Sequence, residues 1–143
     1  MKIDLDYFKR ILQVFLDATT AHIMLADIET EGITICNNRR INEKFLFHIQ
    51  LLMDNQLIGA KDGLADRLID IGIFHSFSGY SVVSKPIRLT QLGHDFASAL
   101  NHNEVISKLK DEFKDMPFKT LFEGSQKLLQ HYVKRKLDIL LQE

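Results

Sequence analysis

The chain has 143 residues, of which 45% are apolar, and its 18 basic and 19 acidic side chains give a formal net charge of −1. This length suits one globular domain with a sizeable core and is too short for two enzyme-sized units. The near-neutral charge excludes a protein that is drawn to nucleic acid or to an anionic membrane by its overall field, so any such contact needs a local patch.

The chain shows no sequence feature of a secreted or membrane protein. Cys36 is the only cysteine and cannot form an internal disulfide, and the first six residues alternate charged and apolar side chains instead of forming an apolar signal core. No apolar run approaches the roughly 18 residues of a membrane span. We therefore expect a cytoplasmic protein without a membrane partner.

The first 60 residues predict two helices and two short strands. Apolar residues at three- and four-residue spacing after Asp4 predict a helix over residues 4–18. Residues 22–28 are compatible with a short strand followed by a polar turn, and residues 42–55 form the second strong helical pattern. Residues 57–59 lead out of that helix as a strand would.

The second half begins with a glycine-rich stretch and ends in helices. Residues 60–86 contain glycines between short apolar runs, which suits a long β-hairpin or wing. After the strand that ends at Leu89, Thr90 is positioned to cap a helix to about Leu100, in which Gly93 permits close packing and Phe96 returns to the core. Two further helices are predicted, from Asn103 (as cap) to Lys114 and from residue 117 or 118 to Leu141.

These elements predict an α+β fold that is mostly helical, with a winged helix-turn-helix-like core over residues 1–100 and a helical extension over residues 101–143, all in one domain. We expect the long last helix to pack on the first helix over residues 118–133. Its apolar terminal segment, Leu137 to Leu141, suggests contact with a second subunit, and hence a homodimer.

Two motifs resemble a known family. The stretch Phe45–Ile58, which includes most of the predicted helix 42–55, contains a His-x-x-Leu-Leu core, and residues Leu89–Phe96 form a Leu-Thr-x-x-Gly-His-x-Phe junction. In order and spacing they resemble an uncharacterised bacterial and phage family known only as a domain of unknown function with winged-helix character. The resemblance covers most of residues 1–115 and implies a winged-helix fold and a role in a phage or mobile element. It supplies no catalytic or binding residues.

Our first functional hypothesis is a winged-helix DNA-binding or transcription-regulator-like protein. A recognition helix presents polar side chains to base edges, but the face of helix 42–55 opposite its core also carries two acidic residues. Basic residues ahead of this helix and in the wing are candidates for phosphate contacts. The candidate DNA-binding residues are Arg39, Arg40, Lys44, Lys61, Lys85 and Arg88.

The alternative hypothesis is a protein-interaction module that does not bind DNA. Phe47 and Leu51 are four residues apart on the face that would read DNA, which suits burial against the C-terminal helices or against a partner equally well. The candidate protein-interaction residues are Phe47, Leu51, Leu137, Leu140 and Leu141.

The sequence gives no reason to expect an enzyme. The six histidines show no metal-binding spacing on one helix face, Cys36 has no partner cysteine or histidine nearby, and the phosphate-binding and nucleophile motifs are absent. We therefore expect no metal, no cofactor and no small-molecule ligand.

Overall fold

The computed structural model describes residues 1–142, which form an α+β fold with six α-helices, one 3-10 helix and seven short strands. Helices predominate, and all strand pairs within these residues are antiparallel. In chain order the elements are α1 (Leu5–Asp17), α2 (Leu25–Thr30), β1 (Cys36–Asn37), β2 (Arg40–Ile41), α3 (Glu43–Asp54), β3 (Ile58–Ala60), β4 (Gly63–Leu64), η1 (Leu68–Ile71), β5 (Ile73–Ser76), β6 (Gly79–Val82), β7 (Ile87–Leu89), α4 (Gln91–Leu100), α5 (Asn103–Glu112) and α6 (Phe118–Leu141).

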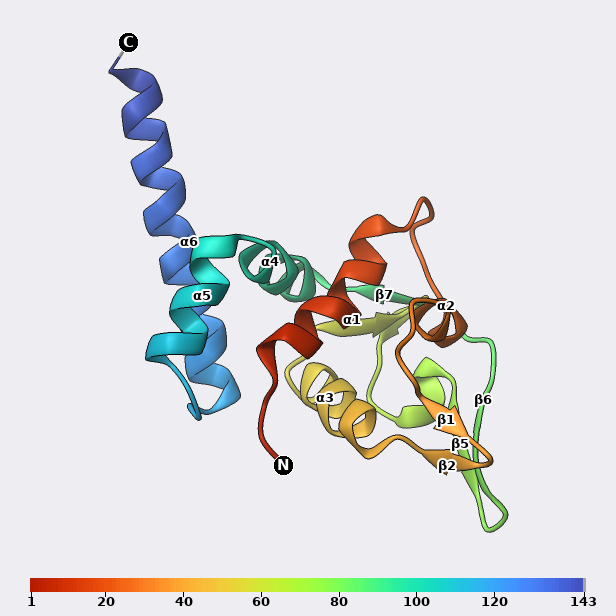
Figure 1. Ribbon diagram of the computed structural model, residues 1–143. Coiled ribbons are helices and arrows are strands. Elements are labelled where there is room, and N and C mark those ends of the chain that lie inside the picture. The colour runs from red at the N-terminus through yellow and green to blue at the C-terminus, as the bar shows by residue number, and fades with distance from the viewer. Residues whose placement is uncertain (143) are drawn as a thin grey trace.

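A small antiparallel sheet joins distant parts of the chain. Its strand order is β4-β3-β7, and Ile23 adds an isolated antiparallel bridge to Ile87 on β7. The bridge has two backbone hydrogen bonds, of 2.9 and 2.8 Å. The segment before α2 therefore lies beside the last strand of the chain, and β7 lies between this segment and β3 (Figure 1).

Two further hairpins lie apart from this sheet. β1 pairs with β2, and β5 pairs with β6 from Ile73↔Val82 to Ser76↔Gly79. Figure 1 shows them together at the end of the molecule farthest from α6. We call this pair of hairpins with their turns, residues 36–41 and 73–82, the two-hairpin end.

The core is formed mainly by helices and is rich in aromatic residues. Phe8 of α1, Phe96 of α4 and Phe118 of α6 pack edge to face, with ring centroids 5.4–5.8 Å apart. The first helix begins at the cap predicted for it, since the Asp4 side chain accepts from the Tyr7 N–H at 3.0 Å.

The junction at the end of β7 also agrees with its prediction. Thr90 Oγ1 accepts from the Gly93 N–H at 3.2 Å and donates to the Gln56 carbonyl at 2.6 Å. A Cβ at Gly93 would collide with the Leu57 carbonyl oxygen, so only glycine fits where α4 crosses the chain leading into β3.

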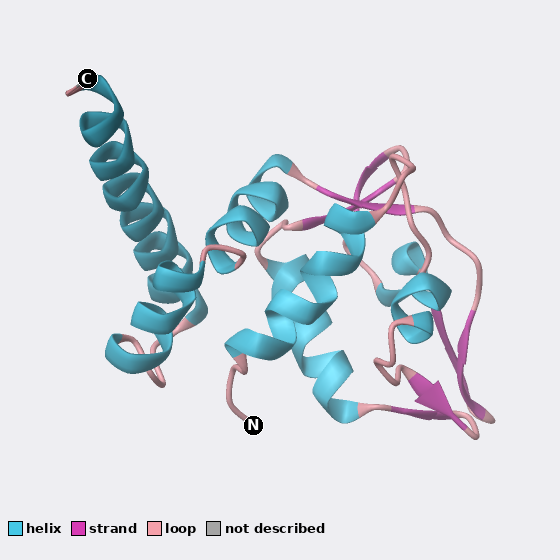
Figure 2. Cartoon of the chain, turned by 45° about the horizontal axis from the view of Figure 1, so that its top comes forward, coloured by secondary structure: helices cyan, strands magenta, loops and turns pink. Residues whose placement is uncertain are grey.

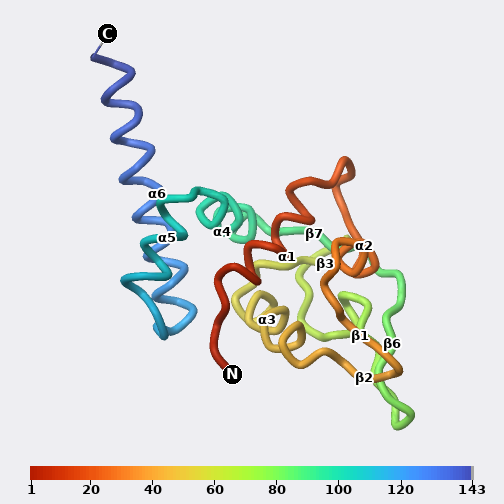
Figure 3. The backbone as a smooth tube through the Cα atoms, in the orientation of Figure 1, coloured from red at the N-terminus to blue at the C-terminus, as the bar shows by residue number. Residues whose placement is uncertain are grey.

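The C-terminal helices form a separate layer. α6 packs against α4 and α5, and its last third extends beyond the body of the molecule (Figures 2 and 3). The prediction that residues 118–133 pack on the first helix is therefore largely wrong. Phe118 touches Phe8 of α1, but α6 packs mainly against α4 and α5, and it is α4 that packs against α1.

Three other local predictions need correction. Residues 22–28 are not a strand beyond the bridge at Ile23, because Asp27 Oδ2 accepts from the Met24 N–H at 2.8 Å and starts α2 there. The cap of α5 is His102, whose Nδ1 accepts from the Val105 N–H, and Asn103 is already helical. Residues 60–86 form β4, η1 and a separate β5–β6 hairpin instead of one long hairpin.

Candidate nucleic-acid interface

The two hairpins at the two-hairpin end are joined by hydrogen bonds to backbone carbonyl groups. The Tyr80 N–H on β6 donates to the Arg39 carbonyl at 2.9 Å, and the Cys36 thiol on β1 donates to the Tyr80 carbonyl at 3.4 Å. Gly79 has a φ of +119°, and a Cβ there would lie 2.6 Å from the Arg39 carbonyl oxygen. The close approach of the hairpins thus requires glycine at this position.

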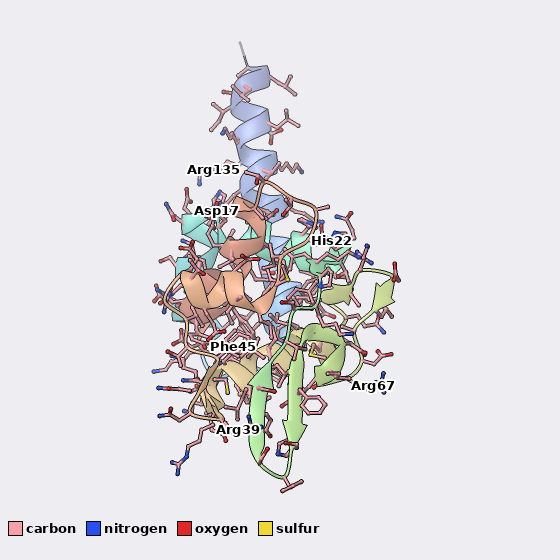
Figure 4. All side chains as sticks on the ribbon, turned by 90° about the vertical axis from the view of Figure 1, so that its right-hand side faces the viewer. Asp17, His22, Arg39, Phe45, Arg67 and Arg135 are labelled. Atoms are coloured by element: carbon pink, nitrogen blue, oxygen red, sulfur yellow. The ribbon has the colours of Figure 1, made fainter. Side chains whose placement is uncertain are left out.

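The Arg39 side chain makes two hydrogen bonds to the turn of the β5–β6 hairpin. Its Nε donates to the Ser78 carbonyl and its Nη2 to the Ser78 hydroxyl, both at 2.8 Å. Within the turn, the Ser78 N–H and hydroxyl also contact the Ser76 hydroxyl, at 3.3 and 2.9 Å. Figure 4 shows Arg39 beside this hairpin, at the opposite end of the molecule from Arg135 on α6. The Arg39 guanidinium is therefore partly used in fixing the turn.

The segments that form this end carry basic residues and no acidic ones. Residues 32–42 and 71–94 contain no Asp or Glu, although the chain has 19 acidic residues. The two-hairpin end itself contains Arg39 and Arg40, both exposed, and the exposed Lys85 and half-buried Arg88 follow β6 in the second segment. A local positive patch on a chain of net charge −1 is the feature that a contact with phosphates needs.

An aromatic side chain projects from the same end. Phe77, in the turn between β5 and β6, is fully exposed, and Phe74 on β5 is 47% exposed. Behind the turn, the rings of His75 and Tyr80 stack across the two strands with centroids 4.1 Å apart. Exposed aromatic groups beside arginines suit a ligand with both phosphates and flat apolar surfaces.

The other predicted DNA-binding residues lie elsewhere. Lys44, on the first turn of α3, forms an ion pair with Asp4 at 2.8 Å and lies over the Tyr7 ring. Arg88 is half-buried on β7, opposite Gly59 of β3, and Lys61 follows β3. Of the six candidates, the structure brings Arg39 and Arg40 to the tips of the hairpins and Lys85 to the base of β6, beside Gly72.

Phe47 and Leu51 are half-buried on α3 and do not form an open apolar face. They line a groove of about 830 Å³ whose other walls are the N-terminal segment and the corner between α5 and α6. The N-terminal segment and the corner between α5 and α6 thus border the face of α3 that a recognition helix would present to DNA. The exposed residues left on α3 are Glu43, Lys44, Gln50 and Asp54.

A buried histidine secures the N-terminal segment to α3. His48 is fully buried, its Nε2 accepts from the Asp4 N–H at 2.9 Å, and its Nδ1 therefore carries the proton donated to the Lys44 carbonyl at 2.7 Å. Burial lowers the pKa of His48 below its ordinary value, and the neighbouring Lys44 charge acts in the same direction.

Asp4 completes this network as a carboxylate. Burial raises its pKa, but the hydrogen bonds from Lys44 and from the Tyr7 backbone, with the charge of Lys44, lower the pKa below its ordinary value overall. Asp4, His48 and Lys44 therefore hold the chain start against α3 at neutral pH, which is a structural role.

The three leucines predicted for contact with a partner are exposed at the end of α6. Leu137, Leu140 and Leu141 are between 51% and 74% exposed, as are Val133 and Ile139 on the same segment. Nothing in the described chain covers them.

Sequence reasoning did not identify Phe77, Ser78 or Gly79 as part of a site. The available signal was the absence of acidic residues over residues 71–94, which was hidden because Asp62, Asp66, Asp70 and Asp95 fall in the same broader segment. The pairing of residues 36–41 with 73–82 could not be read from either segment alone.

Within residues 1–142, no helix is both long and apolar enough to cross a membrane, and no three His, Cys, Asp or Glu side chains are grouped as metal ligands would be. The chain matches no protein-family model, and neither a curated protein nor a solved structure is significantly similar to it. The resemblance to the phage family therefore rests on the two motifs alone.

Proposed function

We propose that this protein is a winged-helix-type protein that binds duplex DNA through the two-hairpin end. The observation that carries the proposal is the meeting of two segments that are free of acidic residues, residues 32–42 and 71–94, in a chain that is otherwise acidic. Arg40 and Lys85 are the side chains proposed to contact phosphates, and Phe77 the one that contacts sugars or bases.

The order of the elements supports a winged-helix arrangement. A helix, a short edge segment, two helices, a strand, a β-excursion and a returning strand follow one another, and the returning strand β7 lies between the edge segment at Ile23 and β3. Two features depart from a simple winged helix: a hairpin, β1–β2, separates α2 from α3, and the β5–β6 hairpin is a sheet of its own.

Contact through the hairpins is favoured over contact through α3. The exposed side chains of α3 include Glu43 and Asp54, which would repel phosphates, and its only basic residue, Lys44, is paired with Asp4. The two hairpins of the two-hairpin end contain no acidic residue of their own. A contact of this kind reads the DNA backbone and groove shape more than base identity.

The test is binding of the purified protein to mixed-sequence duplex DNA over a salt series. We expect a Kd of about 1–100 μM near physiological salt that rises steeply with salt concentration. Arg40→Ala and Lys85→Ala should each weaken binding and reduce the slope of log K against log salt by about 1, which is the loss of one phosphate contact.

Lys44→Ala is the matched control, because it removes one exposed positive charge that belongs to α3 and is already paired with Asp4, and it should therefore leave the salt slope unchanged. Arg39→Ala is a poor probe of phosphate binding, since it also releases the Ser78 turn. If the wild-type protein does not bind at low salt, or if Lys44→Ala weakens binding as much as Arg40→Ala does, the proposed interface is wrong.

A further inference from the structure

The turn between β5 and β6 carries an aromatic side chain that the described chain leaves uncovered. The two strands pair as far as Ser76↔Gly79, so Phe77 and Ser78 form a two-residue turn at the tip of a projecting hairpin (Figure 1). Phe77 has the most exposed large apolar side chain of residues 1–142. Turns favour small and polar residues, so neither turn geometry nor core packing explains a phenylalanine here.

Hydrogen bonds hold the backbone on both sides of Phe77. On one side, the Arg39 guanidinium donates two hydrogen bonds of 2.8 Å to the carbonyl and hydroxyl groups of Ser78. Across the turn, the Ser76 and Ser78 hydroxyls lie 2.9 Å apart, and the Ser78 N–H donates to the Ser76 hydroxyl at 3.3 Å. Because the turn is already ordered, little backbone entropy is lost when the ring is inserted into a partner.

The tip of the hairpin has no bulky side chain except this ring. Phe77 is flanked by Ser76, Ser78 and Gly79, so only small side chains surround it. Paired strands lie about 5 Å apart, and the minor groove of B-DNA is about 6 Å wide and 7.5 Å deep. The tip therefore suits insertion into the minor groove, which widens when an apolar wedge separates two base pairs.

The charges around the tip favour a polyanion as the partner. Arg39 and Arg40 lie beside β6, since the Arg39 carbonyl accepts from the Tyr80 N–H at 2.9 Å. The Arg39 guanidinium bonds only to neutral groups of Ser78 within the described chain, so its positive charge is not neutralised. No acidic side chain of the two segments that form this end offsets the charge.

The apolar part of the contact is a single ring, which favours DNA over a membrane. The strength of membrane binding scales with the apolar area that is buried, and Phe77 is the only apolar residue of the turn. Insertion between base pairs, by contrast, needs only one flat or branched apolar side chain beside groups that bind phosphate.

We propose, on the basis of the proposed binding to duplex DNA, that Phe77 is a wedge that enters the minor groove and separates two stacked base pairs. Opening a step costs stacking energy, and this cost is smallest at pyrimidine–purine steps and at mismatched pairs. The preferred substrate is therefore duplex DNA with a flexible or disrupted step, and the bound duplex is kinked at that step.

The experiment compares the affinity of the protein for a short mixed-sequence duplex and for the same duplex with one central mismatch. Fluorescence anisotropy at one salt concentration measures both dissociation constants. The two duplexes carry the same charge, so a difference in affinity reports the cost of opening a step. We expect the mismatched duplex to be bound roughly tenfold more tightly. The fluorescence of a 2-aminopurine beside the mismatch should increase on binding, because stacking quenches this base.

Three variants assign the effect to the ring of Phe77. Phe77→Ala should bind the two duplexes equally and lose the increase in fluorescence, while the salt slope stays unchanged because no phosphate contact is removed. Phe77→Leu still has a side chain that can act as a wedge and should keep the preference for the mismatch. Phe74→Ala is the matched control, because Phe74 is a half-exposed phenylalanine of the same hairpin that lies on β5 and not in the turn. It should keep the preference as well.

The possible outcomes separate the wedge from the proposed function. If the wild-type protein binds both duplexes equally without an increase in fluorescence, the wedge is wrong and DNA binding through the hairpins stands. If the single strand is bound more tightly than either duplex, Phe77 stacks on unpaired bases and the duplex wedge is again wrong. Equal loss of the preference in Phe74→Ala and Phe77→Ala would overturn the assignment to the turn. Binding to anionic vesicles and to none of these DNAs would overturn both proposals.

Discussion

The helical body and the two-hairpin end are stabilised in different ways. In the body, Phe8, Phe96 and Phe118 interlock, and the first two are completely buried. In the two-hairpin end, Ile73 is the one fully buried residue of β5 and β6, and contacts between backbone groups and the two Arg39 hydrogen bonds hold the strands together. The body thus carries most of the hydrophobic stabilisation, and the hairpins contribute shape and charge.

The same division holds for the acidic residues. All 19 lie outside residues 32–42 and 71–94, and several of them serve the body as caps or ion pairs, as Asp4 does for α1 and Lys44. Regions that bind ligands are often those that contribute little to global stability. Substitutions in the helical body should therefore change the free energy of unfolding, and substitutions in the hairpins should change DNA binding.

The largest expected effect is truncation of the aromatic core. Phe96→Ala removes a completely buried ring that contacts Phe8, Phe118 and Phe122, and should lower the free energy of unfolding by about 3–5 kcal/mol. Urea denaturation measures the loss. Phe77→Ala removes the same group from the hairpin turn, where it is fully exposed, and should change stability by less than about 0.5 kcal/mol. Equal losses would mean that the hairpin turn is part of the core.

A smaller effect is expected at the junction between β7 and α4. Thr90→Ala removes both the cap of α4 and the hydrogen bond to the Gln56 carbonyl, and should cost about 1–2 kcal/mol. Thr90→Ser keeps both hydrogen bonds and is the matched control. If the two variants are equally destabilised, the methyl group of Thr90 and not its hydroxyl stabilises the junction.

Sequence reasoning succeeded where one local signal decides the outcome. The Thr90 cap, the tight packing at Gly93 and the return of Phe96 to the core follow from residue types at fixed spacing, as do the starts of α1 and α3. The strand predicted at residues 22–28 failed because two local signals compete there. A β-compatible apolar run coincides with an Asp27 cap, and the cap prevails once Leu25 and Ile28 can be buried.

The candidate site was only partly predictable, because it depends on contacts between distant segments. Arg39 and Arg40 were recognisable as candidates from their charge, but only the folded chain shows that Arg39 binds Ser78 and that Lys44 is paired with Asp4. Likewise, Phe47 and Leu51 have the spacing of an exposed pair, and the N-terminal segment that half covers them lies more than 40 residues away in the sequence.

Acid should loosen the body through His48. Its pKa in the folded protein lies below the ordinary 6.5, so the unfolded chain takes up the proton first as the pH falls. The free energy of unfolding should therefore be constant above about pH 7 and decrease below about pH 6.5, by about 1 kcal/mol for the hydrogen bond lost from the Asp4 N–H. Protonated His48 would face the Lys44 ammonium, which disfavours the charge, and the Asp4 carboxylate, which favours it, and burial of the ring outweighs the contribution of Asp4.

Urea midpoints measured from pH 8 to pH 5 give this dependence. His48→Gln has no imidazole to titrate and should lose the decrease near pH 6. The loss due to Asp4, whose folded pKa is also lowered, begins only below about pH 4 and is separate. A decrease near pH 6 that persists in His48→Gln would show that His48 is not its cause.

The smallest effect on global stability, and the most informative for function, is expected at Gly79. Gly79→Ala puts a Cβ against the Arg39 carbonyl at a positive φ, so the two hairpins must separate. Because few buried side chains join the hairpins to the body, the hairpins can separate with a loss of less than about 1 kcal/mol in the free energy of unfolding.

Amide exchange at Tyr80, whose N–H donates to the Arg39 carbonyl, should become faster, and DNA binding should weaken although no charge has changed. If exchange becomes faster while binding is unaffected, the arginines act as a flexible charged loop and the joined geometry of the hairpins does not matter for DNA binding.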